Sequence, residues 1–263
     1  MKSLFLVFVF LCSLFVNAQA GMTVSPGKLF FFGNEGNTAP QKIRIINPTD
    51  RELEVGVSIN DWRYDFAGGN EIAAFNSLPE SAASWVRINP GTHVVIPGNS
   101  FKEIEVNLAI PSPQERSRPV HTAMIFLTQL NPSDSQDASG AAIKVAVRIG
   151  VKVYHAISET SGKLSVNDLT ASTDDQNRKW IHLSYSNTGT IWTDGKVAWS
   201  VFSYGTGSTI PLGEQEFYTL PNDRRESRVE LPADLAPGKY TITARVTYEK
   251  NKTVQLAELD FEL

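Results

Sequence analysis

Residues Ile143–Tyr154 read I-K-V-A-V-R-I-G-V-K-V-Y, and every second position from 143 to 153 is Val or Ile. This alternation of β-branched side chains is typical of a strand with one continuous apolar face. The opposite face carries two cations, Arg148 and Lys152. The stretch therefore predicts a long β-strand whose apolar face either packs in a core or is offered to another chain.

Short strand patterns recur along the rest of the chain, with turn residues between them and no long helical periodicity. We expect further strands at 42–46, 53–59, 85–88, 101–108, 123–129, 180–186, 197–202, 228–231, 240–248 and 255–261. Closely spaced short strands predict an all-β fold. The length of 263 residues fits two immunoglobulin-like β-sandwich domains in tandem, with a cleft between them.

The beginning of the chain has the pattern of a cleavable signal peptide. Lys2 precedes an apolar run, which small residues, Ala18 and Ala20, follow. We therefore expect residues 1–20 to be removed on export, and the mature protein to be exported and soluble.

A domain boundary is expected shortly after the alternating stretch ends, where the polar segment Ser158–Lys163 begins. The predicted domains are residues 21–157 and 158–263. The segment Asn131–Gly140, N-P-S-D-S-Q-D-A-S-G, has almost no apolar content. We expect it to be a mobile loop in front of the apolar strand.

Composition argues against several classes of function. The only cysteine, Cys12, lies in the signal segment, and the 4 histidines are scattered, so we expect neither a disulfide nor a metal site. The 28 acidic residues outnumber the 24 basic ones, which argues against nucleic-acid binding. No phosphate-binding loop or clustered set of nucleophile and base stands out, so we expect no cofactor and no enzymatic activity.

Two lysines stand at informative places. Lys28 begins the aromatic-rich strand L-F-F-F, and Lys152 lies near the end of the alternating stretch. If these strands meet near the hinge between the domains, the two ammonium groups form a pocket for a carboxylate. The alternative is that each lysine is an ordinary solvated strand residue.

The apolar side chains at the start of the alternating stretch also have two interpretations. Ile143, Val145 and Val147 are either core residues of a central strand or an exposed edge that can add to another sheet. The polar segment before them favours the edge.

The chain resembles the PapD-like periplasmic chaperones of pilus assembly, whose first domain ends in an alternating strand followed by I-K-L-F-Y-R-P. The matching residues here, Val151–Ala156, read V-K-V-Y-H-A and keep the lysine but lack Arg-Pro. Further similarities are Lys28 before the aromatic strand, where the family usually has arginine, Asp61-Trp62, Trp85–Pro90, Ile96–Gly98 and Pro113–Arg116. The second domain has no family pattern beyond that of an immunoglobulin-like sandwich.

The resemblance implies a periplasmic chaperone that caps exported pilin-like or surface-fibre subunits by donor-strand complementation. Lys28 and Lys152 would bind the subunit's C-terminal carboxylate, and Ile143, Val145 and Val147 would enter its groove. It also implies delivery to an outer-membrane assembly protein, and the apolar strand suggests self-association. The alternative function is a structural or adhesive surface protein of two immunoglobulin-like domains.

Overall fold

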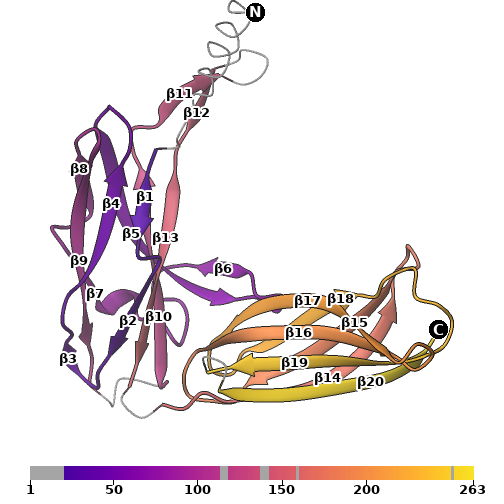
Figure 1. The fold of residues 1–263 in the computed structure, drawn as a ribbon. Coiled ribbons are helices and arrows are strands. Elements are labelled where there is room, and N and C mark those ends of the chain that lie inside the picture. The colour runs from indigo at the N-terminus through magenta and orange to yellow at the C-terminus, as the bar shows by residue number, and fades with distance from the viewer. Residues whose placement is uncertain (1–20, 113–117, 137–141, 158–159, 250–251) are drawn as a thin grey trace, which may run out of the picture.

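The computed structural model describes residues 21–112, 118–136, 142–157, 160–249 and 252–263. It consists of two β-sandwiches joined at an angle (Figure 1). The predicted signal peptide, the Pro113–Arg116 segment, residues 137–140 of the predicted loop and the first two residues of the predicted second domain lie outside the described residues. The signal peptide and the domain boundary at 157/158 therefore stay predictions.

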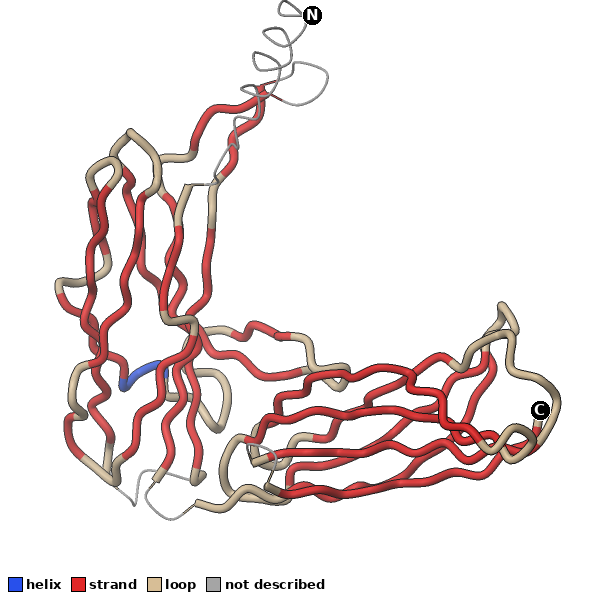
Figure 2. The backbone as a smooth tube through the Cα atoms, viewed as in Figure 1, coloured by secondary structure: helices blue, strands red, loops and turns tan. Residues whose placement is uncertain are grey.

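Strands make up almost all of the regular structure, as Figure 2 shows. In the first half they are β1 Thr23–Ser25, β2 Lys28–Phe32, β3 Gly36–Asn37, β4 Gln41–Asn47, β5 Leu53–Tyr64, β6 Asn70–Ala73, β7 Val86–Asn89, β8 His93–Ile96, β9 Ser100–Ile110, β10 Val120–Gln129, β11 Ser133–Gln136, β12 Ala142–Val145 and β13 Arg148–Ala156. A short 3-10 helix, η2 Ala83–Trp85, precedes β7. In the second half they are β14 Leu164–Thr173, β15 Lys179–Asn187, β16 Thr193–Ser203, β17 Ser208–Thr219, β18 Arg224–Glu230, β19 Lys239–Tyr248 and β20 Thr253–Glu262.

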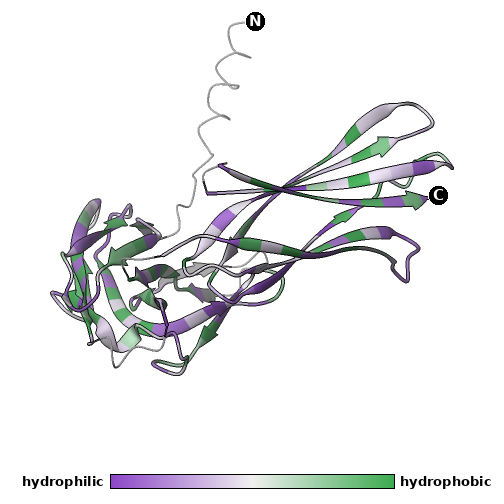
Figure 3. Cartoon of the chain, turned by 90° about the horizontal axis from the view of Figure 1, so that it is seen from below, coloured by the Kyte–Doolittle hydropathy of each residue, from purple (hydrophilic) through white to green (hydrophobic). Residues whose placement is uncertain are grey.

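The first sandwich packs two sheets face to face. One has the order β1-β4-β9-β3, with β7 also on β9, and the other has the order β2-β13-β10-β5-β6, with β8 also on β5. Alternate residues point inward, so Ile43, Ile45 and Ile104 are fully buried while their neighbours face solvent. This period-two burial is what the sequence pattern predicts, and Figure 3 shows the matching alternation of hydrophobic and hydrophilic residues along the strands.

The second sandwich has a sheet β14-β15-β18 and a sheet β17-β16-β19-β20. Its own core contains Leu183, Val201 and Ile242, all fully buried, and the indole of Trp199. The prediction of two immunoglobulin-like sandwiches is therefore confirmed. Within the described residues, no helix has the length and apolarity that crossing a bilayer requires.

Two details of the sequence analysis were wrong. The stretch 143–154 is divided into β12 and β13, because Val147 N–H bonds the side-chain oxygen of Gln129 at 3.4 Å, and Gln129 N–H bonds the Val147 carbonyl at 2.9 Å. The segment 131–140, predicted to be a loop, contains β11, which pairs with β12 as an antiparallel ribbon. The ribbon of β11 and β12 projects beyond the first sandwich (Figure 1).

A third apolar cluster joins the two sandwiches. Trp62 and Tyr154 of the first sandwich pack with Leu220 and Trp192 of the second. The hairpin of β5 and β6 also reaches across, and its turn residue Phe66 accepts a hydrogen bond at 3.3 Å from the backbone N–H of Glu226 on β18. These contacts fix the walls of the cleft.

The core assignment predicts a clear contrast between two isoleucine truncations. Ile104→Ala should lower the free energy of unfolding by about 2–5 kcal/mol, because it removes a fully buried side chain. Ile46→Ala removes a side chain that is 37% exposed, and should cost less than about 1 kcal/mol. Urea denaturation of both variants measures this, and equal losses would contradict the assignment.

Candidate functional site

The two predicted lysines lie side by side. Strand β2 pairs with β13 in parallel, with Lys28 opposite Lys152, and the Lys152 N–H bonds the Gly27 carbonyl at 3.0 Å. The flanking residues Leu29 and Val153 point into the first core, so both lysines lie on the outer face of the sheet. The two strands therefore meet at the lysines, as the sequence analysis had supposed. The role of the lysines stays a prediction.

Aromatic rings surround Lys152. Its Nζ donates a hydrogen bond to Tyr64 Oη at 3.0 Å, and lies 4.2 Å from the ring centroid of Trp62 and 4.3 Å from that of Tyr64. Trp62 is itself fixed, since its Nε1 bonds the Ala123 carbonyl at 2.9 Å. The ammonium group therefore rests on a rigid aromatic support that stabilises a cation without supplying a counter-ion.

Burial, together with the charges of Lys28 and Arg225, lowers the pKa of Lys152 to about 8. Burial raises the pKa of Tyr64 and Tyr154, so both hydroxyls stay protonated at neutral pH. Their oxygens lie 3.3 Å apart. The site thus combines cations with neutral hydroxyl donors, which are the groups that a carboxylate needs.

The second sandwich supplies the other wall. Lys28 Nζ lies 4.1 Å from the ring centroid of Tyr218 on β17. The indole of Trp192 packs against Phe30, with a centroid separation of 5.3 Å, and against Tyr154, with one of 5.2 Å. Trp192 was not anticipated as part of a site, because its sequence neighbours give no signal for the side of the cleft on which it lies.

A small cavity of about 20 Å³ lies between these walls. It is lined by Lys28, Phe30, Tyr64, Tyr154, Trp192, Thr193, Asp194, Tyr218 and Thr219. Among the described residues, no carboxylate forms an ion pair with Lys28 or Lys152. The space suits a single small polar group, about the size of one water molecule, rather than a bulky side chain.

A free strand edge leads to this pocket. In the described sheets, β12 pairs only with β11, and residues 148–151 of β13 pair only with β10, because β2 covers β13 from Lys152 onward. The backbone groups along the other side of this edge are open to a further strand.

The three predicted insertion residues differ in their surroundings. Val145 is 45% exposed, while Val147 is half-buried and packs against the first core. Ile143 lies in β12 opposite Ser135, and its side chain lies outside the described residues. Val147 is thus in part a core residue, whereas Val145 has the exposure expected of a residue on a free edge.

One constellation was missed by the sequence analysis. Ser172 Oγ lies 2.7 Å from His182 Nε2, and His182 Nδ1 lies 3.1 Å from Glu226 Oε1. The three residues are far apart in sequence and meet only through strand pairing. Ser172 is exposed on a regular strand and is not among the residues that line the cavity beside Glu226. We therefore assign the row no catalytic role.

No protein-family model and no curated protein matches the sequence. Among solved structures, the class 5 fimbriae chaperone CfaA matches with a TM-score of 0.52 and 9% identity, over 90% of this chain and 98% of that chain. A chain from a chaperone–tip adhesin complex of CFA/I fimbriae biogenesis matches with a TM-score of 0.51 and 9% identity, over 92% of this chain and 98% of that chain. The fold is that of a two-domain fimbrial chaperone, as the resemblance implied.

The lowered pKa of Lys152 predicts a pH dependence. Below about pH 8 Lys152 is charged in the folded and unfolded states, whereas between about 8 and 10.5 only the unfolded state keeps its proton. Because the unfolded state then binds more protons, the free energy of unfolding should rise with pH in this window. Denaturant titrations at pH 7.5 and 9, below the ionisation of unfolded-state tyrosines, should show the rise, and Lys152→Met should remove the contribution of this residue. A rise of the same size in that variant would contradict the assignment.

Proposed function

We propose that the protein is an exported, periplasmic chaperone that binds one class of surface-fibre subunit by lending it a β-strand. The observation that carries the proposal is the parallel pairing of β2 with β13, which places Lys28 beside Lys152 where an open strand edge ends. An anion site and an unpaired edge are what an incomplete subunit with a free C-terminus requires.

The anchor is a C-terminal carboxylate of the subunit, bound between the two ammonium groups. Charge-assisted hydrogen bonds are stronger than neutral ones, and partial burial strengthens them. The small cavity beside Lys28, which Tyr64 and Tyr154 also line, marks the place where a polar group can enter. Lysine at position 28 lacks the planar fork of arginine, so the ring of Tyr218 orients it instead.

The anchor also fixes the direction of the bound strand. The free edge begins in β12 and runs along β13 to Val151, and the lysines stand at its C-terminal end. A subunit strand that lies on this edge with its carboxylate at the lysines must therefore run parallel to β13. Its register follows from the anchor, because a slip by one residue would turn its side chains to the opposite face.

The apolar contribution comes from Ile143, Val145 and Val147, which would enter the groove left by the subunit's missing strand. Burial of an aliphatic side chain contributes about 1.5–3 kcal/mol. The exposed position of Val145 on a two-stranded ribbon supports this role. The same edge would allow two free chaperones to associate, and an outer-membrane assembly protein would receive the loaded complex. Neither role requires a cofactor or a chemical step.

The anchor is tested by capturing partners from the exported fraction of the protein's own cells. The tagged wild type should retain a small β-rich protein that Lys28→Ala/Lys152→Ala loses, because the carboxylate then has no cation. Lys163→Ala/Lys179→Ala, which changes two lysines elsewhere in the chain, is the control and should retain the same protein.

Extension of the retained protein by a few residues at its C-terminus should also abolish capture, because the carboxylate can no longer reach the lysines. Capture of the same partners by both lysine variants would overturn the anchor. It would favour a structural or adhesive surface protein instead.

Strand lending is tested at Val145. Val145→Asp should reduce retention of the subunit by about tenfold or more, because a charge must enter an apolar groove. Val254→Asp, at a similarly exposed valine on β20, should leave retention unchanged. Competition binding with the purified subunit measures both variants, and equal effects would argue against a specific role for the β12 edge.

A further inference from the structure

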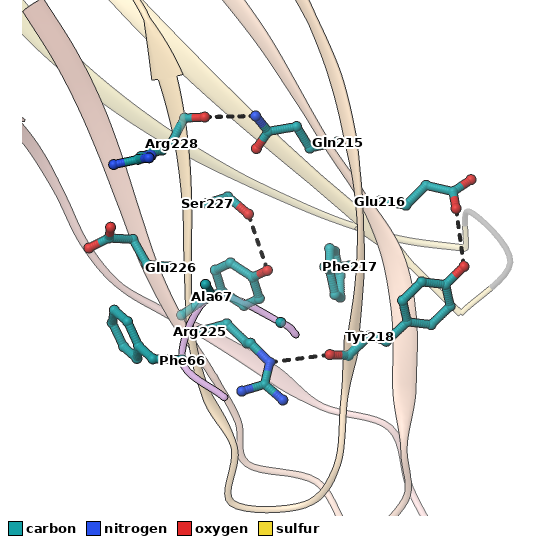
Figure 4. Close-up of a pocket in the computed structure, with 12 residues that line it drawn as sticks. Phe66, Ala67, Gln215, Glu216, Phe217, Tyr218, Arg225, Glu226, Ser227 and Arg228 are labelled. Carbon is teal, nitrogen blue, oxygen red and sulfur yellow. Dashed lines mark hydrogen bonds between the residues drawn. The ribbon is translucent and has the colours of Figure 1, made fainter. Parts of the chain in front are cut away.

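Arg225 is a buried cation of the second sandwich that contacts both sandwiches. It lies on β18 and is 3% exposed. Its Nη1 donates to the Asp65 carbonyl of the first sandwich at 2.5 Å, whereas its Nε donates to the Tyr218 carbonyl of the second at 3.3 Å, as Figure 4 shows for Tyr218. Its Nη2 donates to Asp223 Oδ2 at 2.5 Å. The planar guanidinium thus ties three backbone segments together.

The residues that Arg225 holds are those that support the two lysines. Asp65 directly follows Tyr64, and the guanidinium carbon lies 4.9 Å from the Tyr64 ring centroid. Tyr64 in turn accepts the hydrogen bond of Lys152. On the other side, Tyr218 places its ring beside Lys28. One arginine therefore contacts both aromatic residues on which the lysines rest.

The environment of Arg225 makes this arrangement rigid. Burial lowers the pKa of the Arg225 guanidinium and raises that of the Asp223 carboxyl, and each partner's charge opposes the change in the other. Asp223 also accepts the Leu220 N–H at 2.6 Å. A buried pair with its hydrogen bonds satisfied allows few alternative positions, because any movement leaves a charge without a partner.

The turn between β5 and β6 completes the connection. The Phe66 carbonyl accepts a hydrogen bond from the backbone N–H of Glu226. Phe66, Ala67 and Gly68 also line a cavity of about 520 Å³, together with residues of β17 and β18 (Figure 4). Arg225 supplies a second hydrogen bond between this turn and the second sandwich, through the Asp65 carbonyl. Loss of the guanidinium should therefore release Tyr64 and Tyr218 relative to each other.

We propose that Arg225 is a positioning residue, which fixes Tyr64 and Tyr218 across the interface between the sandwiches and so holds the ammonium groups of Lys152 and Lys28 in place above their paired strands. The carboxylate anchor of the proposed function would then depend on how the two sandwiches are joined at Arg225. The role in carboxylate binding rests on the proposed function, whereas the contacts of Arg225 are present in the free protein.

The test uses the free, full-length mature protein and two readouts that stability alone would not move. The first is the yield of the Lys28–Lys152 cross-link with 1,5-difluoro-2,4-dinitrobenzene, a short amine-reactive reagent, measured by peptide mass spectrometry. The second is the midpoint of the Lys152 titration, followed by carbon-13 NMR of the lysine side chain. In the wild type the two lysines are paired residues of adjacent strands and their ammonium groups rest on fixed rings, so the cross-link should form.

Arg225→Met should lower the cross-link yield at least about fivefold and raise the titration midpoint, because a neighbouring positive charge is gone. Arg228→Met is the matched control. Arg228 lies on the same strand with its guanidinium carbon 4.7 Å from the Trp180 ring, and its loss should change neither readout. Arg225→Lys keeps the charge and loses the fork, so its cross-link yield should also fall, and it carries the test if Arg225→Met does not fold.

A wild-type cross-link yield in a folded Arg225 variant would overturn the inference, even if the titration midpoint of Arg225→Met rises, because the lost charge alone raises that midpoint. A wild-type protein that captures no subunit would overturn the proposed function and leave these results in place. The two failures are therefore distinguishable.

Discussion

The parallel pairing of β2 with β13 is the interaction on which the rest of the site depends. It places Lys28 next to Lys152, covers β13 from Lys152 onward and leaves the preceding edge open. The hydrogen bond from Lys152 N–H to the Gly27 carbonyl marks the point where the edge closes. Without this pairing, two lysines remote in sequence would be separate surface charges of little consequence.

The second sandwich converts that pair into a pocket. Tyr218 and Trp192 form a wall that the first sandwich lacks, and Arg225 holds the wall to the turn that follows Tyr64. Aromatic rings stabilise a cation less than water does. Burial among them, with the charges of Lys28 and Arg225 nearby, therefore lowers the pKa of Lys152 to about 8. The charge therefore remains available to a carboxylate from another chain.

The sequence predicted those parts that depend on local pattern. Alternation located most strands and the two sandwiches, and Lys28 and Lys152 were named from their positions at strand ends. It could not predict the break at Val147, because this depends on a hydrogen bond to Gln129, which is remote in sequence. Nor could it predict Tyr218, Trp192 and Arg225, which reach the site only through the packing of one sandwich on the other.

The closed end of the strand edge has a consequence for timing. A segment in the middle of a chain cannot stop at Lys28, because the residues that follow it would collide with β2 on β13. In the proposed complex, only a chain whose last residue is already free would occupy the edge and end at the lysines. Under the proposed function, a subunit recognised in this way would have completed both its synthesis and its passage across the membrane, and the pocket would distinguish finished chains from unfinished ones.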